Sequence, residues 1–297
     1  MSDSPDSTGS DSVGSDSAPK GGGGDALLSV RGLCKYFPIF SQGLFRRQTG
    51  LVKACHDISF DLMPGETLGI VGESGSGKST LARTLLRVTE PTAGSAIFRA
   101  PDPIDLVSLS GRELKRLRPR IQMIFQDPFS SLNPRLTIQQ IIGEPLTVHG
   151  RARGSELTDR VVEMMRRVGI RPEYRTRYPH AFSGGQRQRI GIARALILEP
   201  TLVVADEAVS SLDVSVQAQI INLLMDLQSE LGLSYLFIAH DLSVVRHIAN
   251  HVAVMTRGEI VEYGPTARVF DNPEHEYTRR LLGSVLNPDP DQRKRPS

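Results

Sequence analysis

Nine consecutive residues have the composition of a loop that closes around a phosphate group. The segment reads Gly-Glu-Ser-Gly-Ser-Gly-Lys-Ser-Thr. Glycines allow backbone N–H groups to approach an anion closely, and the lysine places a point charge on the β- and γ-phosphates of a nucleotide. The hydroxyl of the serine that follows the lysine is suited to Mg²⁺. We therefore predict an ATP phosphate site formed by Gly72, Glu73, Ser74, Gly75, Ser76, Gly77, Lys78, Ser79 and Thr80.

The segments on either side of this loop are those that must position it. A short apolar run at residues 66–71 precedes the loop and is typical of a buried strand. A helix expected at residues 78–88 would turn its positive end toward the bound anion. A chance Gly/Ser-rich turn would lack both neighbours, so this context favours the phosphate interpretation.

Two carboxylates follow another apolar run. Asp206 comes directly after the expected strand at residues 202–205, and Glu207 is next. A carboxylate at the carboxyl end of a strand beside a phosphate loop can hold Mg²⁺ through water, and its neighbour can act as the general base for an attacking water. An Asp-Glu pair alone is usually a helix cap or a loop, but the phosphate loop favours the catalytic interpretation here.

Phosphate loops occur in kinases, GTPases, helicases and transporter motors, and the segment at residues 182–189 discriminates among them. It contains Ser183-Gly184-Gly185-Gln186 and resembles the signature motif of ABC ATPases. Ser183 lies 23 residues before Asp206, which is the customary spacing in that family. Gln126 resembles the family's Q-loop glutamine, Asp213 its D-loop aspartate and His240 its switch histidine.

The resemblance implies roles for these residues. Catalysis is assigned to Glu207, His240, Gln126 and Lys78, and Mg²⁺ binding to Ser79, Gln126 and Asp206. The signature residues would open a helix whose free N–H groups bind the γ-phosphate held by a second ATPase subunit. Two ATP molecules would then be sandwiched between two head-to-tail subunits, and hydrolysis would loosen the dimer.

The family stacks adenine on an aromatic residue shortly after the first strand. Phe37 has the spacing from Lys35 that fits best, and Tyr36 is the second candidate. The alternative, that both rings pack inside the protein, stays open.

Several segments resemble one subfamily, the ATP-binding subunits of oligopeptide and dipeptide importers. These segments are residues 126–135, 178–180, 212–219, 232–235 and 272–282. The resemblance implies import of di- or oligopeptides, two transmembrane permease subunits, an extracytoplasmic peptide-binding protein and a second ATPase in a hetero- or homodimer, with a heteromer favoured. It places the chain peripherally on the cytoplasmic face of a prokaryotic inner or plasma membrane. Nickel chelates and glutathione remain open as cargo. The alternative is an ATPase in a soluble complex such as a carbon–phosphorus lyase.

Some positions depart from the family pattern. Ala208 replaces the usual proline after the catalytic glutamate, Phe182 replaces the commoner leucine before the signature, and Glu276 replaces a frequent proline in the tail. None removes a ligand, so we still expect activity. The tail has no cysteine cluster, so we expect no iron–sulfur site.

Alternating strands and helices predict an α/β fold with a mainly parallel sheet. The resemblance implies a P-loop NTPase with a RecA-like core, a small antiparallel β subdomain and an inserted α-helical signature subdomain. We expect a disordered leader at 1–25, an ATPase domain at 26–270 with its insert at about 127–185, and an importer-type extension at 271–297. The insert should carry an apolar helix face formed by Leu157, Val161, Met165 and Val168.

The remaining expected elements follow from apolar runs and turn residues. We expect strands at 27–30, 54–62, 121–125 and 234–239, with a polar and aromatic excursion at 38–50. Helices are expected at 185–198 and 215–231, and a hairpin joins 252–255 to 259–263.

Composition places the chain among ordinary globular proteins. The net charge of +2 gives no argument for nucleic acid, and the basic clusters at 115–120 and 293–295 are interpreted as solvated faces. Two cysteines are too few for a disulfide framework or a metal cluster and fit a reducing compartment. The sequence has neither a membrane-spanning run nor a secretory signal, so other chains would bring it to a membrane.

Overall fold

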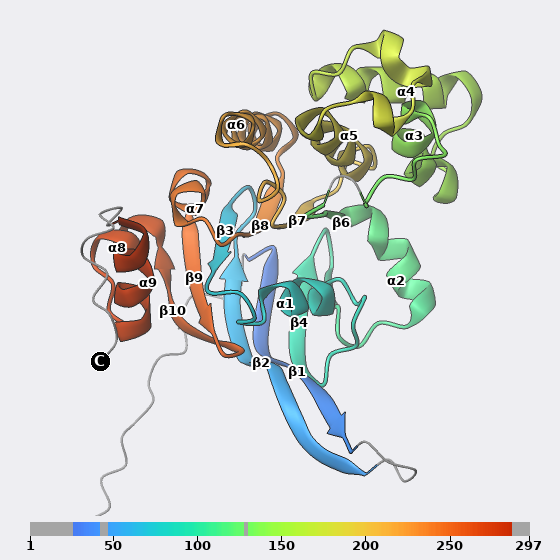
Figure 1. Cartoon of the computed structure of the whole chain (residues 1–297). Helices are drawn as coiled ribbons and strands as arrows, with labels where there is room; N and C mark the ends of the chain where they lie inside the picture. The colour runs from blue at the N-terminus through green and yellow to red at the C-terminus, as the bar shows by residue number, and fades with distance from the viewer. Residues whose placement is uncertain (1–25, 42–46, 128–129, 287–297) are drawn as a thin grey trace, which may run out of the picture.

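The computed structural model describes residues 26–41, 47–127 and 130–286. The expected leader at 1–25 and two residues of the Q-loop segment, Pro128 and Phe129, lie outside the described residues. The described chain forms two β-sheets, with helices around them and a helical lobe at one end (Figure 1).

The larger sheet is mainly parallel. In spatial order its strands are β10 (Glu259–Pro265), β9 (His251–Thr256), β3 (Thr67–Val71), β8 (Ser234–Ile238), β7 (Leu202–Asp206) and β6 (Ile121–Ile124). The pairs β6–β7, β7–β8, β8–β3 and β3–β9 are parallel, and β10 pairs antiparallel with β9 through the expected hairpin. The predicted α/β class and the predicted hairpin are therefore confirmed.

This sheet is buried on both faces, which explains why its strands read as continuous apolar runs. Side chains alternate between the faces of a strand, so each strand contributes to two cores. In β8, for example, Leu236 and Ile238 pack on the side of the antiparallel sheet, and Tyr235 and Phe237 pack on the side of the helices. The two cores hold the strand ends in fixed positions.

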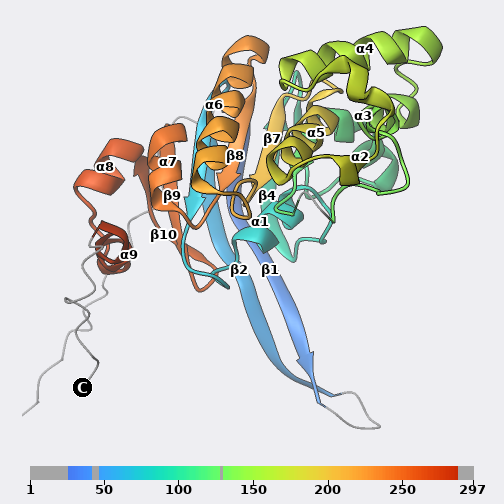
Figure 2. The ribbon, with the colours of Figure 1, turned by 45° about the horizontal axis from the view of Figure 1, so that its top comes forward.

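The smaller sheet is antiparallel, with the order β2-β1-β4-β5. Its strands are β1 (Leu28–Phe40), β2 (Gln48–Leu62), β4 (Ala93–Arg99) and β5 (Pro103–Asp105). The segment at 38–50 was expected as an excursion between two shorter strands, but its residues 38–40 and 48–50 belong to β1 and β2, which pair as one long ribbon as far as Phe40 opposite Gln48. Aromatic and β-branched residues such as Phe37 and Val52 sustain this pairing. The ribbon extends well away from the body of the molecule (Figure 2).

Helices surround the sheets (Figures 1 and 2). They are α1 (Lys78–Leu85), α2 (Gly111–Leu117), α3 (Ile138–Val148), α4 (Gly154–Arg167), α5 (Gly184–Leu196), α6 (Val214–Leu231), α7 (Leu242–Ile248), α8 (Thr266–Asp271) and α9 (Glu276–Leu286). Of these, α3, α4 and α5 lie at one end of the molecule and α8 and α9 at the other. Short 3₁₀ turns lie at Arg118–Arg120, Pro172–Thr176 and Pro179–Ala181. Within the described residues, no helix combines the length and apolar composition that a membrane crossing needs.

The helical lobe consists of α3, α4 and α5, beside the edge strand β6 (Figure 1). The apolar stripe predicted for α4 faces its core: Val161, Met165 and Val168 are fully buried, and Leu157 is partly buried against them. These residues belong to the same continuous core that covers the helix side of the large sheet, which gives α5 a firm support.

Helix α1 is shorter than expected and ends at Leu85 rather than residue 88. Arg87 adopts a left-handed backbone with φ of 51°, which interrupts the helical hydrogen bonding after the first two turns. The helix packs against β1, β2 and β7, with Leu81, Ala82 and Leu85 in the core that it shares with the antiparallel sheet.

Candidate active site

The predicted site residues follow the carboxyl ends of neighbouring strands. The phosphate loop follows β3, Asp206 ends β7, Gln126 lies two residues after β6, and His240 lies two residues after β8. Because β6, β7, β8 and β3 are parallel neighbours, their carboxyl ends meet at one edge of the sheet. The sheet therefore gathers side chains that are far apart in the sequence.

The phosphate loop is pressed against two strands at positions where only glycine fits. A Cβ atom on Gly72 would lie 2.0 Å from the carbonyl oxygen of Met255 in β9, and one on Gly77 would lie 2.1 Å from that of Ala54 in β2. Gly77 also has φ of 108° and occupies the N-cap of α1. The loop is thereby folded directly over the amino end of that helix, where backbone N–H groups are free to bind an anion.

Lys78 is buried inside the loop, with 4% of its surface exposed. Its Nζ donates hydrogen bonds to the carbonyl oxygens of Gly72 at 2.7 Å and Glu73 at 2.8 Å. Burial lowers the pKa of Lys78, while the carboxylates of Glu207, Asp206 and Glu73 oppose this shift. The ammonium group is thus held where the loop would surround a phosphate.

Ser79 and Asp206 meet across 127 positions of sequence. The Ser79 hydroxyl donates to Asp206 Oδ1 at 3.0 Å, and Asp206 is 4% exposed. Burial raises the pKa of Asp206. The hydrogen bond from Ser79 lowers this pKa, and the negative charge of Glu207 raises it further. A hydroxyl oxygen beside one buried carboxylate matches the way proteins bind Mg²⁺, which takes few protein oxygens and completes its shell with phosphates and water. The donor set therefore fits this ion.

Glu207 faces two of the other predicted catalytic groups. Its Oε2 accepts a hydrogen bond from Gln126 Nε2 at 2.7 Å and lies 3.6 Å from His240 Nδ1. The backbone of Glu207 is left-handed, with φ of 49°. This conformation is held by the hydrogen bond that Glu207 N–H donates to Ile238 O. Ser210 also donates two hydrogen bonds to the carbonyl oxygen of Glu207. A strained residue fixed by several contacts is characteristic of functional sites.

Ala208 follows in the same turn and is 1% exposed. The hydrogen bonds from Ser210 to Glu207 close this turn on either side of Ala208. The turn is therefore well fixed with alanine in place of the family's proline.

The two aromatic candidates for the adenine platform differ in their surroundings. The Phe37 ring is 40% exposed, with Lys35 Nζ 4.7 Å from its centroid. The Tyr36 hydroxyl is engaged with His56 Nδ1 at 2.6 Å. Phe37 therefore offers the more accessible ring, and its role stays a prediction.

The signature residues lie on the helical lobe rather than with the phosphate loop. Ser183 is exposed and caps α5: its Oγ accepts from Gln186 N at 3.4 Å, and Gln186 Oε1 accepts from Ser183 N at 3.1 Å. Gly184 and Gly185 form the first turn, where backbone N–H groups have no partner within the helix. Asp213, at the N-cap of α6, is also exposed. These groups face outward from the chain.

Arg194 was not among the residues singled out from the sequence. It lies on α5, 11 residues after Ser183, so three helical turns separate them. Its guanidinium donates to Ser131 O at 2.6 Å and lies 5.8 Å from the Phe125 ring centroid. Arg194 therefore ties the signature helix to the segment that carries Gln126. The sequence gives no distinct signal for Arg194, because α5 also carries Arg187 and Arg189.

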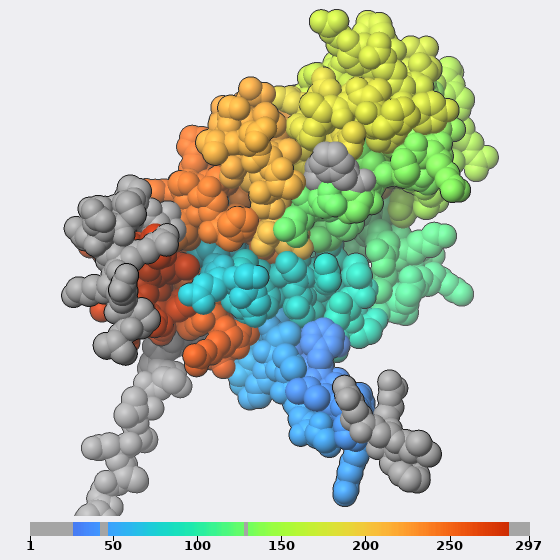
Figure 3. All heavy atoms as spheres, viewed as in Figure 1, coloured from blue at the N-terminus to red at the C-terminus, as the bar shows by residue number. Residues whose placement is uncertain are grey.

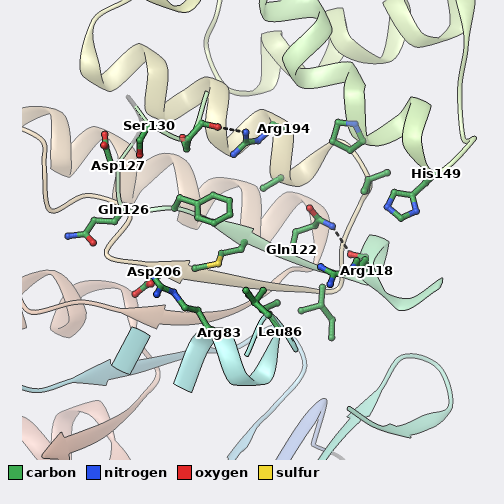
Figure 4. A pocket seen from close by; sticks show the side chains of 18 residues that line it. Arg83, Leu86, Arg118, Gln122, Gln126, Asp127, Ser130, His149, Arg194 and Asp206 are labelled. Atoms are coloured by element: carbon green, nitrogen blue, oxygen red, sulfur yellow. Dashed lines mark hydrogen bonds between the residues drawn. The ribbon is translucent and has the colours of Figure 1, made fainter. Parts of the chain in front are cut away.

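A hollow of about 740 Å³ lies between the helical lobe and the sheet edge. Asp206 and Gln126 line one end of it, and Arg118 and His149 line the other (Figure 4). Arg194 projects into it from α5 (Figure 4). The hollow connects the surface of the lobe with two of the predicted metal-site residues.

Two family models match the chain. The ABC transporter model matches residues 55–210, and the model for the C-terminal region of oligopeptide/dipeptide transporters matches residues 261–297. The first includes the phosphate loop, the signature and the Asp206–Glu207 pair, and the second includes α8 and α9.

Individual transport proteins also match the chain over most of its length. The oligopeptide transport ATP-binding protein AppF of Bacillus subtilis is 54% identical over 262 residues, which are 88% of this chain and 78% of AppF. The glutathione import ATP-binding protein GsiA of Salmonella paratyphi A is 57% identical over 271 residues, or 91% of this chain, but the chain spans only 43% of GsiA.

Among solved structures, the dimeric ATP-binding cassette MJ0796 in a post-hydrolysis state with ADP and Pi aligns with a TM-score of 0.70 and 27% identity. The alignment covers 81% of this chain and 99% of the cassette. These matches confirm the fold class and the resemblance on which the site residues were chosen. The chain belongs to the ABC transporter family and carries the C-terminal region of the oligopeptide/dipeptide transporters.

Proposed function

We propose that this chain binds ATP with Mg²⁺ and hydrolyses it at the edge of the parallel sheet. The observation that carries the proposal is the pairing of Ser79 with Asp206 and of Gln126 with Glu207 beside the buried Lys78. The phosphate loop supplies N–H groups and the Lys78 ammonium to the phosphates. Adenine stacks on Phe37, and the phosphate loop from Gly72 to Thr80 encloses the triphosphate.

Glu207 acts as the general base in this scheme. Its carboxylate takes a proton from the water that attacks the γ-phosphate, while Gln126 and His240 hold the carboxylate and the water in line. Ser79, Asp206 and Gln126 would hold Mg²⁺, which would supply positive charge to the phosphate oxygens. Burial of Lys78 and Asp206 strengthens these electrostatic effects, because charges interact more strongly away from water.

The site of one chain is completed by a second subunit. The signature residues Ser183, Gly184, Gly185 and Gln186 face outward from the helical lobe, as does Asp213. In a head-to-tail dimer they would bind the γ-phosphate held by the partner's phosphate loop. The partner is a second ABC ATPase, either another copy or a different chain, and the subfamily favours a different chain.

A mixing experiment tests this arrangement. Ser183→Ala and Lys78→Ala chains each place a defect in both sites of a homodimer, whereas a mixed dimer has one site with both defects and one with neither. We expect partial recovery of ATP hydrolysis after mixing. If mixed chains stay as inactive as each variant alone, the head-to-tail arrangement is wrong. For a heteromeric pair, the same two changes are placed in the appropriate subunits.

The proposed process is import of peptides through a membrane transporter. Support comes from the oligopeptide/dipeptide transporter region at residues 261–297 and from the 54% identity to AppF. The chain would sit peripherally on the cytoplasmic face of the membrane, with two transmembrane permeases and an extracytoplasmic peptide-binding protein. The hollow beside Arg194 is suited to receive a permease segment, because movement there would reach Gln126 directly.

The cargo proposed is a short peptide. The GsiA relatives are named for glutathione, which is itself a tripeptide, so both groups of relatives point to one chemical class. Affinity capture of the tagged chain from gently solubilised membranes tests the whole assembly. Two permeases, a second ATPase and a binding protein carrying a peptide are the expected companions. Capture of soluble enzymes alone would contradict transport and favour an assembly of the carbon–phosphorus-lyase type.

A further inference from the structure

The C-terminal helix α9 reaches back to the phosphate loop. The hydroxyl of Tyr277, in the first turn of α9, accepts a hydrogen bond from the backbone N–H of Glu73 at 3.1 Å. The two residues are 204 positions apart. In the space-filling view, the red atoms of the C-terminal segment lie beside the cyan atoms of the segment after β3 (Figure 3). This contact joins the region typical of peptide transporters to the loop that all ATPases of this type need.

The N–H in question belongs to the peptide unit that joins Gly72 to Glu73. The carbonyl oxygen of the same unit, Gly72 O, accepts the 2.7 Å hydrogen bond from Lys78 Nζ. A peptide unit is planar, with its N–H and C=O directed to opposite sides, so fixing one fixes the other. The Tyr277 hydroxyl and the Lys78 ammonium therefore hold one rigid group from its two sides.

The position of Tyr277 is itself well determined. Its side chain is 7% exposed and packs in the main core together with Phe270 and Leu282. The turn before α9 is held by Glu262, whose carboxylate accepts hydrogen bonds from Glu274 N at 2.9 Å and His275 N at 3.1 Å. The hydroxyl thus stands on a rigid support, which a positioning contact requires.

The contact between Tyr277 and Glu73 lies at the wall of a cleft. A cleft of about 470 Å³ lies between the phosphate loop, the β9–β10 turn and α9. Glu73, Arg257 and Arg280 line it together with Tyr277.

We propose that Tyr277 is a positioning residue for nucleotide binding. Its hydroxyl sets the orientation of the Gly72–Glu73 peptide and, through Gly72 O, the place of the Lys78 ammonium. This inference rests on the proposed role of Lys78 in binding the phosphates. The C-terminal region is then a structural part of the ATP site.

Tyr277→Phe in the full chain tests the inference, because it removes one oxygen atom and keeps the ring in the core. Tyr263→Phe is the matched control, since the Tyr263 hydroxyl donates to Asp61 O at 2.9 Å, outside the phosphate loop. The measurements are the Kd for Mg²⁺–ADP by calorimetry, KM and kcat for ATP hydrolysis, and the Tm without nucleotide. All are made on both variants and on the unchanged chain.

We expect Tyr277→Phe to raise the ADP Kd and the ATP KM by about three- to ten-fold, the range that one net hydrogen bond covers. The kcat at saturating ATP should stay close to that of the unchanged chain, and the nucleotide-free Tm should fall no further than in Tyr263→Phe, which also loses one hydrogen bond. Tyr263→Phe should leave Kd and KM unchanged. Unchanged Kd and KM in Tyr277→Phe would overturn the inference. So would an equal loss in the control, or a loss of kcat that follows a lowered Tm.

Lys78→Ala separates failure of this inference from failure of the proposed site. If Lys78→Ala loses ADP affinity while Tyr277→Phe keeps it, only the role of Tyr277 is wrong. If Lys78→Ala binds ADP as the unchanged chain does, the proposed phosphate site fails, and the role of Tyr277 fails with it.

Discussion

Replacing Glu207 with glutamine removes the proposed base while preserving the shape of the site. Glutamine has nearly the same volume, and its amide oxygen can still accept the hydrogen bond that Gln126 Nε2 donates at 2.7 Å. The side chain is 19% exposed and His240 Nδ1 lies 3.6 Å away, so the variant has little room to rearrange. The substitution therefore tests proton transfer rather than folding.

The expected loss of turnover in Glu207→Gln follows from the role of Glu207 as a general base. A positioned general base contributes about 10²- to 10⁴-fold to a rate, which corresponds to about 3–5 kcal/mol of barrier height. The carboxylate contacts Gln126 and His240, whereas the phosphates are assigned to the loop around Lys78. We therefore expect kcat to fall by that factor while the affinity for ATP stays within about threefold of its original value.

The assay is phosphate release at saturating ATP, together with ATP binding at equilibrium. Glu66→Gln is a matched control, because Glu66 Oε2 also faces a histidine, with His251 Nδ1 3.4 Å away, but lies before β3 at the opposite end of that strand. The control should retain full turnover. Turnover by Glu207→Gln above one tenth of the original rate would refute the base assignment. A parallel loss of ATP affinity would show that Glu207 binds nucleotide instead.

Three further predictions concern stability. Because burial raises the pKa of Asp206, folding favours its protonated form, and stability falls as pH rises from the ordinary aspartate value through the folded pKa. Asp206→Asn should thus raise the Tm without nucleotide near pH 7, by roughly 2–4 °C per kcal/mol gained, and abolish Mg²⁺-dependent hydrolysis. In acid, where Asp206 is itself protonated, the Tm of the variant and of the unchanged chain should converge. An unchanged Tm at every pH would contradict this. Gly77→Ala forces a Cβ to 2.1 Å from Ala54 O at φ of 108° and should cost about 2–5 kcal/mol in urea unfolding, a result that wild-type stability would exclude. Met165→Ala opens a cavity in the helical lobe and should cost about 2–5 kcal/mol in the same assay, and a cost below about 1 kcal/mol would show that the stripe is not packed as described.

Local sequence patterns were sufficient to predict an element where the burial of that one segment determines its residue types. The strands of the parallel sheet, the β9–β10 hairpin and the apolar face of α4 were all predicted, because burial on both faces or on one face imposes a readable periodicity. The outer part of the β1–β2 ribbon was predicted as an excursion rather than as paired strands, because it is exposed and its sequence has no regular alternation. Strands β4 and β5 were not predicted either. Strand β4 pairs with the distant β1, and β5, which follows β4 closely, has only 3 residues, too few for a readable pattern.

The sequence by itself determined which chemical groups the candidate site offers. The phosphate loop, the signature and the Asp206–Glu207 pair are each contiguous, and their residue types restrict what they can bind. Only the tertiary structure decided which side chains meet. Gln126 reaches Glu207 across 81 positions, and Tyr277 reaches Glu73 across 204 positions. Such contacts depend on how strands order themselves in a sheet and how helices pack at its edge. These arrangements arise from burial summed over the whole chain, so no local pattern encodes them.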